Sequence, residues 1–406
     1  MAVSALIAGA VLTSTATSVS SAATPQASTE SPSETATDRL EAAFTRGFET
    51  SGASGATVGV WVPGQEPYVA SKGVADRESG EPMTPEMQAP IGSVTKTYTV
   101  LVALQLVREG VLGLDDTIEL WYPTYPEAAN ITLRMLMNHS SGVSDISEVQ
   151  IELKCADHQA VLTPDELIDL SAGLPREPFA PGQGSSYSSA NTIILGRILE
   201  KVTATGYEDL LTQRLFEPLG LDRTRLDDDG VLEAPFAHGY TNFCAPGLPT
   251  GIDTSSWPLI AFSGGALAAT IDDLLAYGVA FGEGYGLDDE LRGARIEQTA
   301  PGDPSSGLGL VVERDPATGG VVSLGHAGSV MGYGANLVYY PCTGTVFAVM
   351  ANVDFSPALI DILREVQPVV QELATGPCAP AVVEPTTSEP AAAPVQPIVA
   401  SPRFAG

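Results

Sequence analysis

The chain has 406 residues, 44% of them hydrophobic, and a formal net charge of −30 at pH 7. This length suits one large domain with tails, and the apolar fraction suffices for a substantial core. The negative charge argues against a nucleic-acid-binding protein, because the surface would repel phosphates. A small substrate remains open, since a local site can differ in charge from the whole molecule.

The first residues are typical of a secretory signal. Ala5–Leu12 forms an apolar core, and small residues follow at Ser21–Ala23, although neither Lys nor Arg precedes the core. The apolar run is too short to cross a bilayer as a helix, so we expect no transmembrane span. We predict a signal peptide over residues 1–23, a flexible leader over 24–37, and a secreted protein, extracellular or associated with the cell wall.

A helix and a hairpin are predicted next. Apolar residues recur at helical spacing over Asp38–Ser51, with Asp38 as its N-cap. Thr57–Val62 and Tyr68–Lys72 are predicted strands on either side of a Pro-Gly turn.

The stretch Gly92-Ser93-Val94-Thr95-Lys96 carries the first chemical signal. A serine and a lysine three apart lie on one face of a helix. The run that follows, Tyr98–Val107, is apolar on nearly every side, so this helix is expected to be buried. Burial lowers the pKa of a lysine, and the neutral amine of Lys96 could then take the proton of Ser93. None of the other three lysines has a serine at this offset.

Helices dominate the middle of the chain. A short helix capped by threonine ends near His139, which we expect to fix a loop through hydrogen bonds rather than to act as a base. Tyr187 precedes a predicted helix, whose positive dipole end would favour a phenolate or a strong hydrogen bond; a core tyrosine is the alternative. His238 is expected to be structural. The predicted helices in this region are Pro164–Ala172, Thr192–Val202 and Thr270–Phe281.

Strands return near the end. They are predicted at Gly307–Val312, Gly319–Leu324, His326–Tyr333, Asn336–Tyr340 and Thr345–Asn352, before a helix at Pro357–Leu373. The predicted fold class is therefore α/β in an α+β arrangement: an antiparallel sheet flanked by helices, with an all-helical subdomain. We place this domain at residues 38–375 and a Pro/Ala-rich tail at 376–406. The active site is expected between the sheet and the helical region.

The set formed by Ser93 with Lys96, Tyr187, and His326-Ala327-Gly328 resembles the serine β-lactamase and penicillin-binding-protein group. Its spacing is most similar to class C β-lactamases and to D-alanyl-D-alanine carboxypeptidases of the actinobacterial type. The resemblance extends from about Asp38 to Thr375 and implies a β-lactamase/transpeptidase-like fold.

The resemblance also implies roles. Ser93 would be acylated, Lys96 would accept its proton, and Tyr187 would relay a proton to the leaving group and later activate water. His326 stands where many relatives have lysine. The backbone N–H groups of Ser93 and Ser329 would form the oxyanion hole, which stabilises the negative charge of acyl transfer.

Some positions depart from the family pattern. Ser189 stands where asparagine is usual, although Asn191 is close by, and Ala327 replaces a threonine that would bind a substrate carboxylate. Carboxypeptidases of this type place an arginine at the position of Val311, and the nearest arginine here is Arg314. These departures weaken carboxylate recognition more than acyl transfer.

Three functional hypotheses follow. The first is a serine hydrolase acting through an acyl-enzyme, a D-alanyl-D-alanine carboxypeptidase or β-lactamase-like enzyme on cell-wall peptides. A carboxylesterase on the same fold is the alternative, and a non-catalytic wall-binding protein is the third. In each case we expect a monomer, with a small molecule or peptide as its ligand.

The sequence predicts neither a cofactor nor a metal centre, since its four histidines form no metal-binding motif. The four cysteines permit three pairings. We expect disulfides between Cys155 and Cys244 and between Cys342 and Cys378, because an exported protein favours them.

Overall fold

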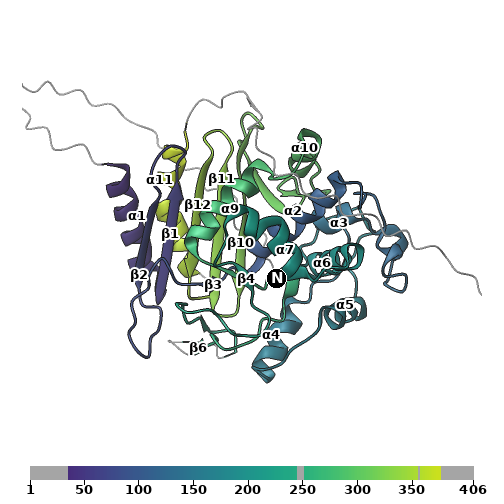
Figure 1. Ribbon diagram of the computed structural model, residues 1–406, viewed down its shortest axis with the longest axis horizontal. Helices are drawn as coiled ribbons and strands as arrows, with labels where there is room; N and C mark the ends of the chain where they lie inside the picture. The colour runs from purple at the N-terminus through teal and green to yellow at the C-terminus, as the bar shows by residue number, and fades with distance from the viewer. Residues whose placement is uncertain (1–34, 245–250, 355–356, 376–406) are drawn as a thin grey trace, which may run out of the picture.

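The computed structural model describes residues 35–244, 251–354 and 357–375 (Figure 1). The predicted signal peptide, most of the predicted leader and the predicted tail lie outside these residues. Within the described ranges, no helix is both long and apolar enough to cross a membrane.

A seven-stranded sheet forms the centre, in the order β2-β1-β12-β11-β10-β9-β8, and neighbouring strands run antiparallel. The first and last long strands are neighbours, since Val58 pairs with Val349. The predicted antiparallel sheet, built from both ends of the chain, is confirmed. Its strands are β1 (Gly55–Trp61), β2 (Tyr68–Gly73), β8 (Ser306–Gly307), β9 (Leu310–Arg314), β10 (Val321–Val330), β11 (Tyr333–Tyr340) and β12 (Thr345–Ala351).

Two terminal helices, α1 (Ala36–Ser51) and α11 (Pro357–Leu373), cover one face of the sheet, on the left of Figure 1. The predicted N-cap at Asp38 is wrong. Thr35 is the N-cap: its hydroxyl accepts from the backbone N–H of Asp38, and the Asp38 carboxylate accepts from the backbone N–H of Thr35, both at 3.1 Å. Asp38 thus closes a capping box from inside the helix.

Helix α9 (Ile271–Glu283) packs on the opposite face, capped by Thr270 as predicted. The approach is close because glycines face the sheet. A Cβ on Gly278 would lie 2.4 Å from Val346.

The helical region extends beyond α9, on the right of Figure 1. Helix α5 begins at Pro164 as predicted, whereas α6 begins at Ser189, three residues before the predicted Thr192. The helices of this region are α2 (Thr95–Arg108), α3 (Leu133–Met137), α4 (Ser147–Ala156), α5 (Pro164–Gly173), α6 (Ser189–Thr203), α7 (Tyr207–Leu211), α8 (Glu217–Leu219) and α10 (Asp289–Glu297). There are also two small sheets. The first contains β3 (Ala89–Pro90), β7 (Leu267–Ala269) and β4 (Arg225–Leu226), in that order. The second pairs β5 (Tyr240–Thr241) with β6 (Ile252–Asp253).

Strand β10 corrects one prediction and prepares the site. The sequence predicted two strands that separate at Gly325, but the chain continues through it as one strand. A Cβ there would lie 2.6 Å from the carbonyl oxygen of Leu337, so this glycine serves close packing of strands. The register with β9 ends at Gly325, whereas the pairing with β11 continues to Val330. The last five residues of β10, 326–330, therefore pair with β11 on one edge only, and their other edge faces the helical region.

Candidate active site

Ser93 lies in a 3₁₀ turn, Gly92–Val94, which leads directly into α2 rather than forming part of it. Residues three apart stack on each other in such a turn. The predicted proximity is therefore preserved, and the Nζ of Lys96 lies 2.9 Å from the Oγ of Ser93.

Lys96 is enclosed, with 1% of its surface exposed. Its Nζ also contacts the Oγ of Ser189, at 3.3 Å, and donates to the carbonyl oxygen of Gly264. Burial lowers the pKa of Lys96 to about 7, and the negative charge of Asp145 opposes this shift. A large fraction of the amine is therefore unprotonated at neutral pH, as a base for Ser93 requires.

Tyr187 approaches Ser93 from the start of α6. Its hydroxyl donates to the Oγ of Ser93 at 2.8 Å. Burial raises the pKa of Tyr187 well above its ordinary value, so the side chain stays a neutral phenol. Of the two effects expected at this helix terminus, the structure has the hydrogen bond and not the phenolate, because desolvation dominates.

His139 supports Tyr187 from behind, with the two ring centroids 4.5 Å apart. Its Nδ1 accepts from the backbone N–H of Ser188 at 3.3 Å and from the side-chain amide of Asn191 at 3.0 Å. Burial lowers the pKa of His139 to about 3. The prediction of a loop-fixing histidine is confirmed. Asn191, whose carbonyl also accepts from Ser141, is bonded to this support and not to Ser93.

His326 lies on β10, with its ring centroid 6.3 Å from that of Tyr187. Its Nδ1 is 2.6 Å from the carbonyl oxygen of Ala327, which can only accept, so this nitrogen carries a hydrogen. Burial, and secondarily the charge of Lys96, lower the pKa of His326 to about 4. The ring is thus neutral at pH 7 and does not supply the positive charge of a lysine.

The turn that holds Ser93 packs directly on β10. A Cβ on Gly92 would lie 2.5 Å from the backbone nitrogen of Ser329, and one on Gly328 would lie 1.9 Å from the carbonyl oxygen of Ile91. The same Cβ on Gly328 would lie 3.1 Å from the backbone nitrogen of Ser93. The two nitrogens expected to form the oxyanion hole are therefore found at one junction of turn and strand.

The comparison with protein families decides the affiliation. The family model described as Beta-lactamase matches residues 40–367. The chain belongs to the beta-lactamase family. The predicted family and its fold are confirmed.

Among curated relatives of this beta-lactamase family member is a D-aminopeptidase of Brucella anthropi, 29% identical over 265 residues, which are 64% of this chain and 49% of the relative. A D-aminopeptidase of Brucella canis is 30% identical over 264 residues, 64% of this chain and 49% of that protein. The chain thus spans about half the length of the curated relatives it matches.

Several solved structures have a similar fold. A D-amino acid amidase from Ochrobactrum anthropi SV3, complexed with L-phenylalanine amide, is 25% identical with a TM-score of 0.71, over 83% of this chain and 99% of that one. A penicillin-binding protein from Bacillus halodurans, 22% identical with a TM-score of 0.71 over 80% and 98%, shares the fold. An octameric penicillin-binding protein homologue from Pyrococcus abyssi, 23% identical with a TM-score of 0.68 over 82% and 77%, also shares it. That this chain is a monomer stays a prediction.

The sequence analysis missed one charged residue of this family member's site, Asp145. Its Oδ1 accepts from the backbone N–H of Ser189 at 2.8 Å and from the hydroxyl of Ser147 at 3.1 Å. Local sequence gave no signal for it, because Asp145 lies 49 positions after Lys96 and meets it only through the tertiary fold.

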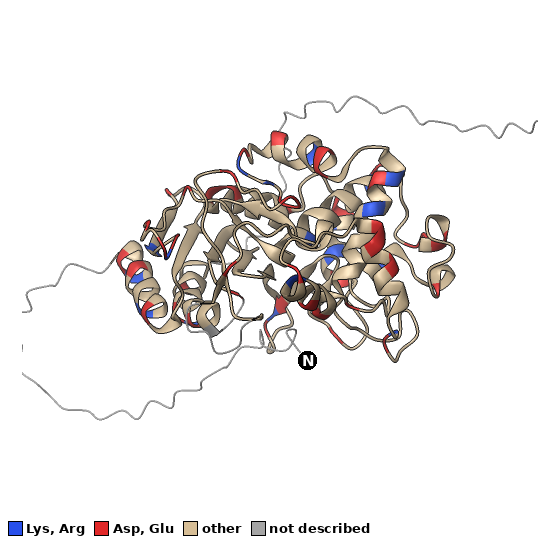
Figure 2. Ribbon diagram, turned by 90° about the horizontal axis from the view of Figure 1, so that it is seen from below, with Lys and Arg blue, Asp and Glu red and all other residues tan. Residues whose placement is uncertain are grey.

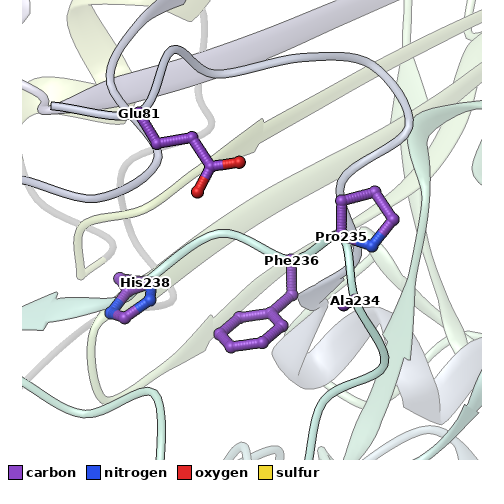
Figure 3. Close-up of a pocket in the computed structure, with 5 residues that line it drawn as sticks. All are labelled: Glu81, Ala234, Pro235, Phe236 and His238. Atoms are coloured by element: carbon purple, nitrogen blue, oxygen red, sulfur yellow. The ribbon is translucent and has the colours of Figure 1, made fainter. Parts of the chain in front are cut away.

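Other candidates lie elsewhere. His238 bonds to the carboxylate of Asp253 at 2.8 Å, in keeping with a structural role. With Glu81, Ala234, Pro235 and Phe236 it lines an open hollow of about 340 Å³, which no residue around Ser93 lines (Figure 3).

Over the described residues, no group of three or more His, Cys, Asp or Glu side chains could hold a metal ion. Cys155 and Cys244 form the predicted disulfide, whereas Cys378, the predicted partner of Cys342, lies outside the described residues.

Proposed function

We propose that this member of the beta-lactamase family hydrolyses its substrate through an acyl-enzyme on Ser93. One observation carries the proposal: the Oγ of Ser93 is within hydrogen-bonding distance of both the Nζ of Lys96, at 2.9 Å, and the hydroxyl of Tyr187, at 2.8 Å. A nucleophile between a free amine and a neutral phenol has the base and the acid that acyl transfer needs.

Each proton has a place in this scheme. Lys96 takes the proton of Ser93 as Oγ attacks the substrate carbonyl. The backbone N–H groups of Ser93 and Ser329 stabilise the oxyanion. Tyr187, which its raised pKa keeps protonated, gives its proton to the leaving group and regains one from Lys96. Water then attacks the acyl-enzyme and loses its proton to the same pair of side chains, which pass it to the Oγ of Ser93 as the acyl–Oγ bond breaks.

For the acyl donor we favour an amide or peptide of a D-residue with a free amino group. The D-aminopeptidase and D-amino acid amidase relatives support this class. The charges of the site agree, since His326 is neutral at pH 7, while the carboxylate of Asp145 lies close to Lys96.

The D-alanyl-D-alanine carboxypeptidase or β-lactamase-like activity is the second candidate, supported by the motif set alone. A cationic partner would favour a substrate carboxylate, but Arg314 is bonded instead to Glu297 and to the carbonyl oxygen of Ile296. A carboxylesterase remains the alternative, because the groups around Ser93 do not depend on a leaving nitrogen. The disulfide between Cys155 and Cys244 supports a secreted protein.

A substrate panel tests the proposal, with Ser93→Ala as the blank. The panel contains D-alanine p-nitroanilide, D-phenylalanine amide, a peptide ending in D-Ala-D-Ala, a penicillin and p-nitrophenyl acetate. We expect the D-amino acid amides to have the highest kcat/KM, and Ser93→Ala to lose about 10⁴-fold in kcat or more. A Ser93→Ala protein as active as the unmodified one would refute catalysis by this site.

A further inference from the structure

Two serine side chains, Ser189 and Ser147, form a row that connects Lys96 to the carboxylate of Asp145. The Oγ of Ser189 lies 3.3 Å from the Nζ of Lys96 and 3.4 Å from the Oγ of Ser147. The Ser147 hydroxyl donates to the Oδ1 of Asp145 at 3.1 Å.

One arrangement of hydrogens satisfies every contact along this row, although the phenol oxygen of Tyr187 is a second acceptor beside the Ser189 hydroxyl. A carboxylate accepts and does not donate, so the hydrogen of Ser147 points to Asp145. The oxygen of Ser147 then accepts from Ser189, and the oxygen of Ser189 is left to accept from Lys96.

In the same arrangement, the hydrogen bonds of Lys96 set the direction of its lone pair. A neutral lysine amine has two hydrogens and one lone pair. The carbonyl oxygen of Gly264 takes one hydrogen and Ser189 takes the other. The lone pair is left for the hydroxyl of Ser93, as proton abstraction requires.

We propose that Asp145, acting through Ser147 and Ser189, is a positioning residue that directs the lone pair of Lys96 toward Ser93. The inference rests on the proposed function, because it gives Lys96 the role of base. It assigns a purpose to Ser189, whose hydroxyl oxygen accepts from Lys96 while its hydrogen points to Ser147.

The middle of the row is held from outside the site. Ser147 is the first residue of α4, and Cys155 in its last turn forms the disulfide with Cys244. Between them, the side chain of Gln150 donates to the carbonyl oxygen of Ile260. Both contacts restrain the helix that carries Ser147.

Several titratable groups face Lys96. They are Asp145 and His139 on the loop before α4, Tyr187 before α6 and His326 on β10. Burial keeps the two histidines and the tyrosine neutral at pH 7. Asp145 is the carboxylate whose charge favours the protonated amine, so its removal also changes the pH at which Lys96 becomes a base.

The decisive variant is Ser147→Ala, which breaks the row but leaves the bond between Asp145 and the backbone of Ser189. The readout is the rate at which a fluorophosphonate labels Ser93, followed by intact mass across pH. We expect a rate lowered about tenfold, restored by Ser147→Thr, with the KM for D-alanine p-nitroanilide unchanged. Ser144→Ala is the matched control, since its hydroxyl bonds to the carbonyl oxygen of Pro175 outside the row, and it should label within about twofold of the unmodified rate.

Asp145→Asn gives a second readout. Loss of the negative charge should shift the acidic limb of the labelling profile to lower pH. Labelling of Ser147→Ala at the unmodified rate, or an unmoved limb in Asp145→Asn, would overturn the positioning role. If Ser147→Ala fails to fold in a thermal melt, Ser189→Ala breaks the row at its other end and decides the matter. Failure of the unmodified protein to label at Ser93 would instead refute the proposed function.

Discussion

The role proposed for Lys96 as a base opposes its contribution to stability. Folding lowers the pKa of Lys96 from 10.5 to about 7, so above pH 7 an ammonium group of the unfolded chain becomes a largely neutral amine. Between these values the unfolded state binds more protons than the folded state, so the contribution of Lys96 to stability becomes more favourable as pH rises from about 7 to about 10. Around pH 7 the unfavourable contribution reaches about 4 kcal/mol.

This conflict predicts that Lys96→Met is inactive but more stable. The methionine fills a similar volume without a charge, although it leaves the carbonyl oxygen of Gly264 without its donor. We therefore expect a gain of about 1–3 kcal/mol in the free energy of unfolding at pH 7. The gain should disappear toward pH 10, where the unfolded lysine loses its charge. Urea denaturation of both proteins at pH 7, 8.5 and 10 measures it, and a difference that does not vary with pH would contradict this account.

At the scale of elements, the site depends on how closely the turn at Ser93 approaches β10. Gly328 permits that approach, because a Cβ there would lie 1.9 Å from the carbonyl oxygen of Ile91. Gly328→Ala must displace either the strand or the turn. Since a shift of about 1 Å in a reacting group can cost about 10²-fold, we expect a loss of at least that size in kcat/KM.

A glycine without neighbours provides the control. Gly293 is exposed inside α10, and a Cβ there would meet nothing within 4 Å. Gly293→Ala should raise the free energy of unfolding by about 0.5–1 kcal/mol, because alanine favours the helix, and leave activity unchanged. Fluorophosphonate labelling and thermal melts of both variants test the contrast. Normal labelling of Gly328→Ala would show that the junction adapts.

The elements and residues that sequence could predict are those governed by local rules. The last helix was placed at Pro357–Leu373, as found, because its apolar spacing and its initial proline are local signals. Ser93 and Lys96 were paired through helical spacing, and the family resemblance placed Tyr187 beside them.

The errors near the site arose where distant contacts decide the outcome. Gly325 looked like a break between strands because its tight packing against β11 is not visible in the local sequence. Asn191 was expected at the site because it is close in sequence to Ser189, whereas its side chain bonds to Ser141 and to His139, 52 positions away. Asp145 was missed for the same reason, since its effect on Lys96 exists only in the folded chain.

At the scale of the whole molecule, the site lies where two parts of the fold meet. Ser93, Lys96 and Tyr187 come from the helical region, whereas His326 and Ser329 come from the sheet. Around both parts, acidic residues are spread over helices and loops, with few basic ones between them (Figure 2). The acidic excess of the described residues is thus distributed over the helices and loops of the fold, and its self-repulsion weakens the compact state.

This repulsion predicts that salt stabilises the protein at neutral pH. The ion pairs of the described surface offset this repulsion little. Pairs such as Arg46 with Glu365 are exposed and contribute about 0–1 kcal/mol each to stability. Raising NaCl from about 20 mM to about 500 mM shortens the screening length several-fold and should raise Tm by about 2–6 °C at pH 7.5. The control is the same titration near the isoelectric point of about 4.2, where the net repulsion vanishes and the rise should vanish with it. A Tm that falls with salt at pH 7.5 would mean that attraction between the interspersed charges outweighs their repulsion.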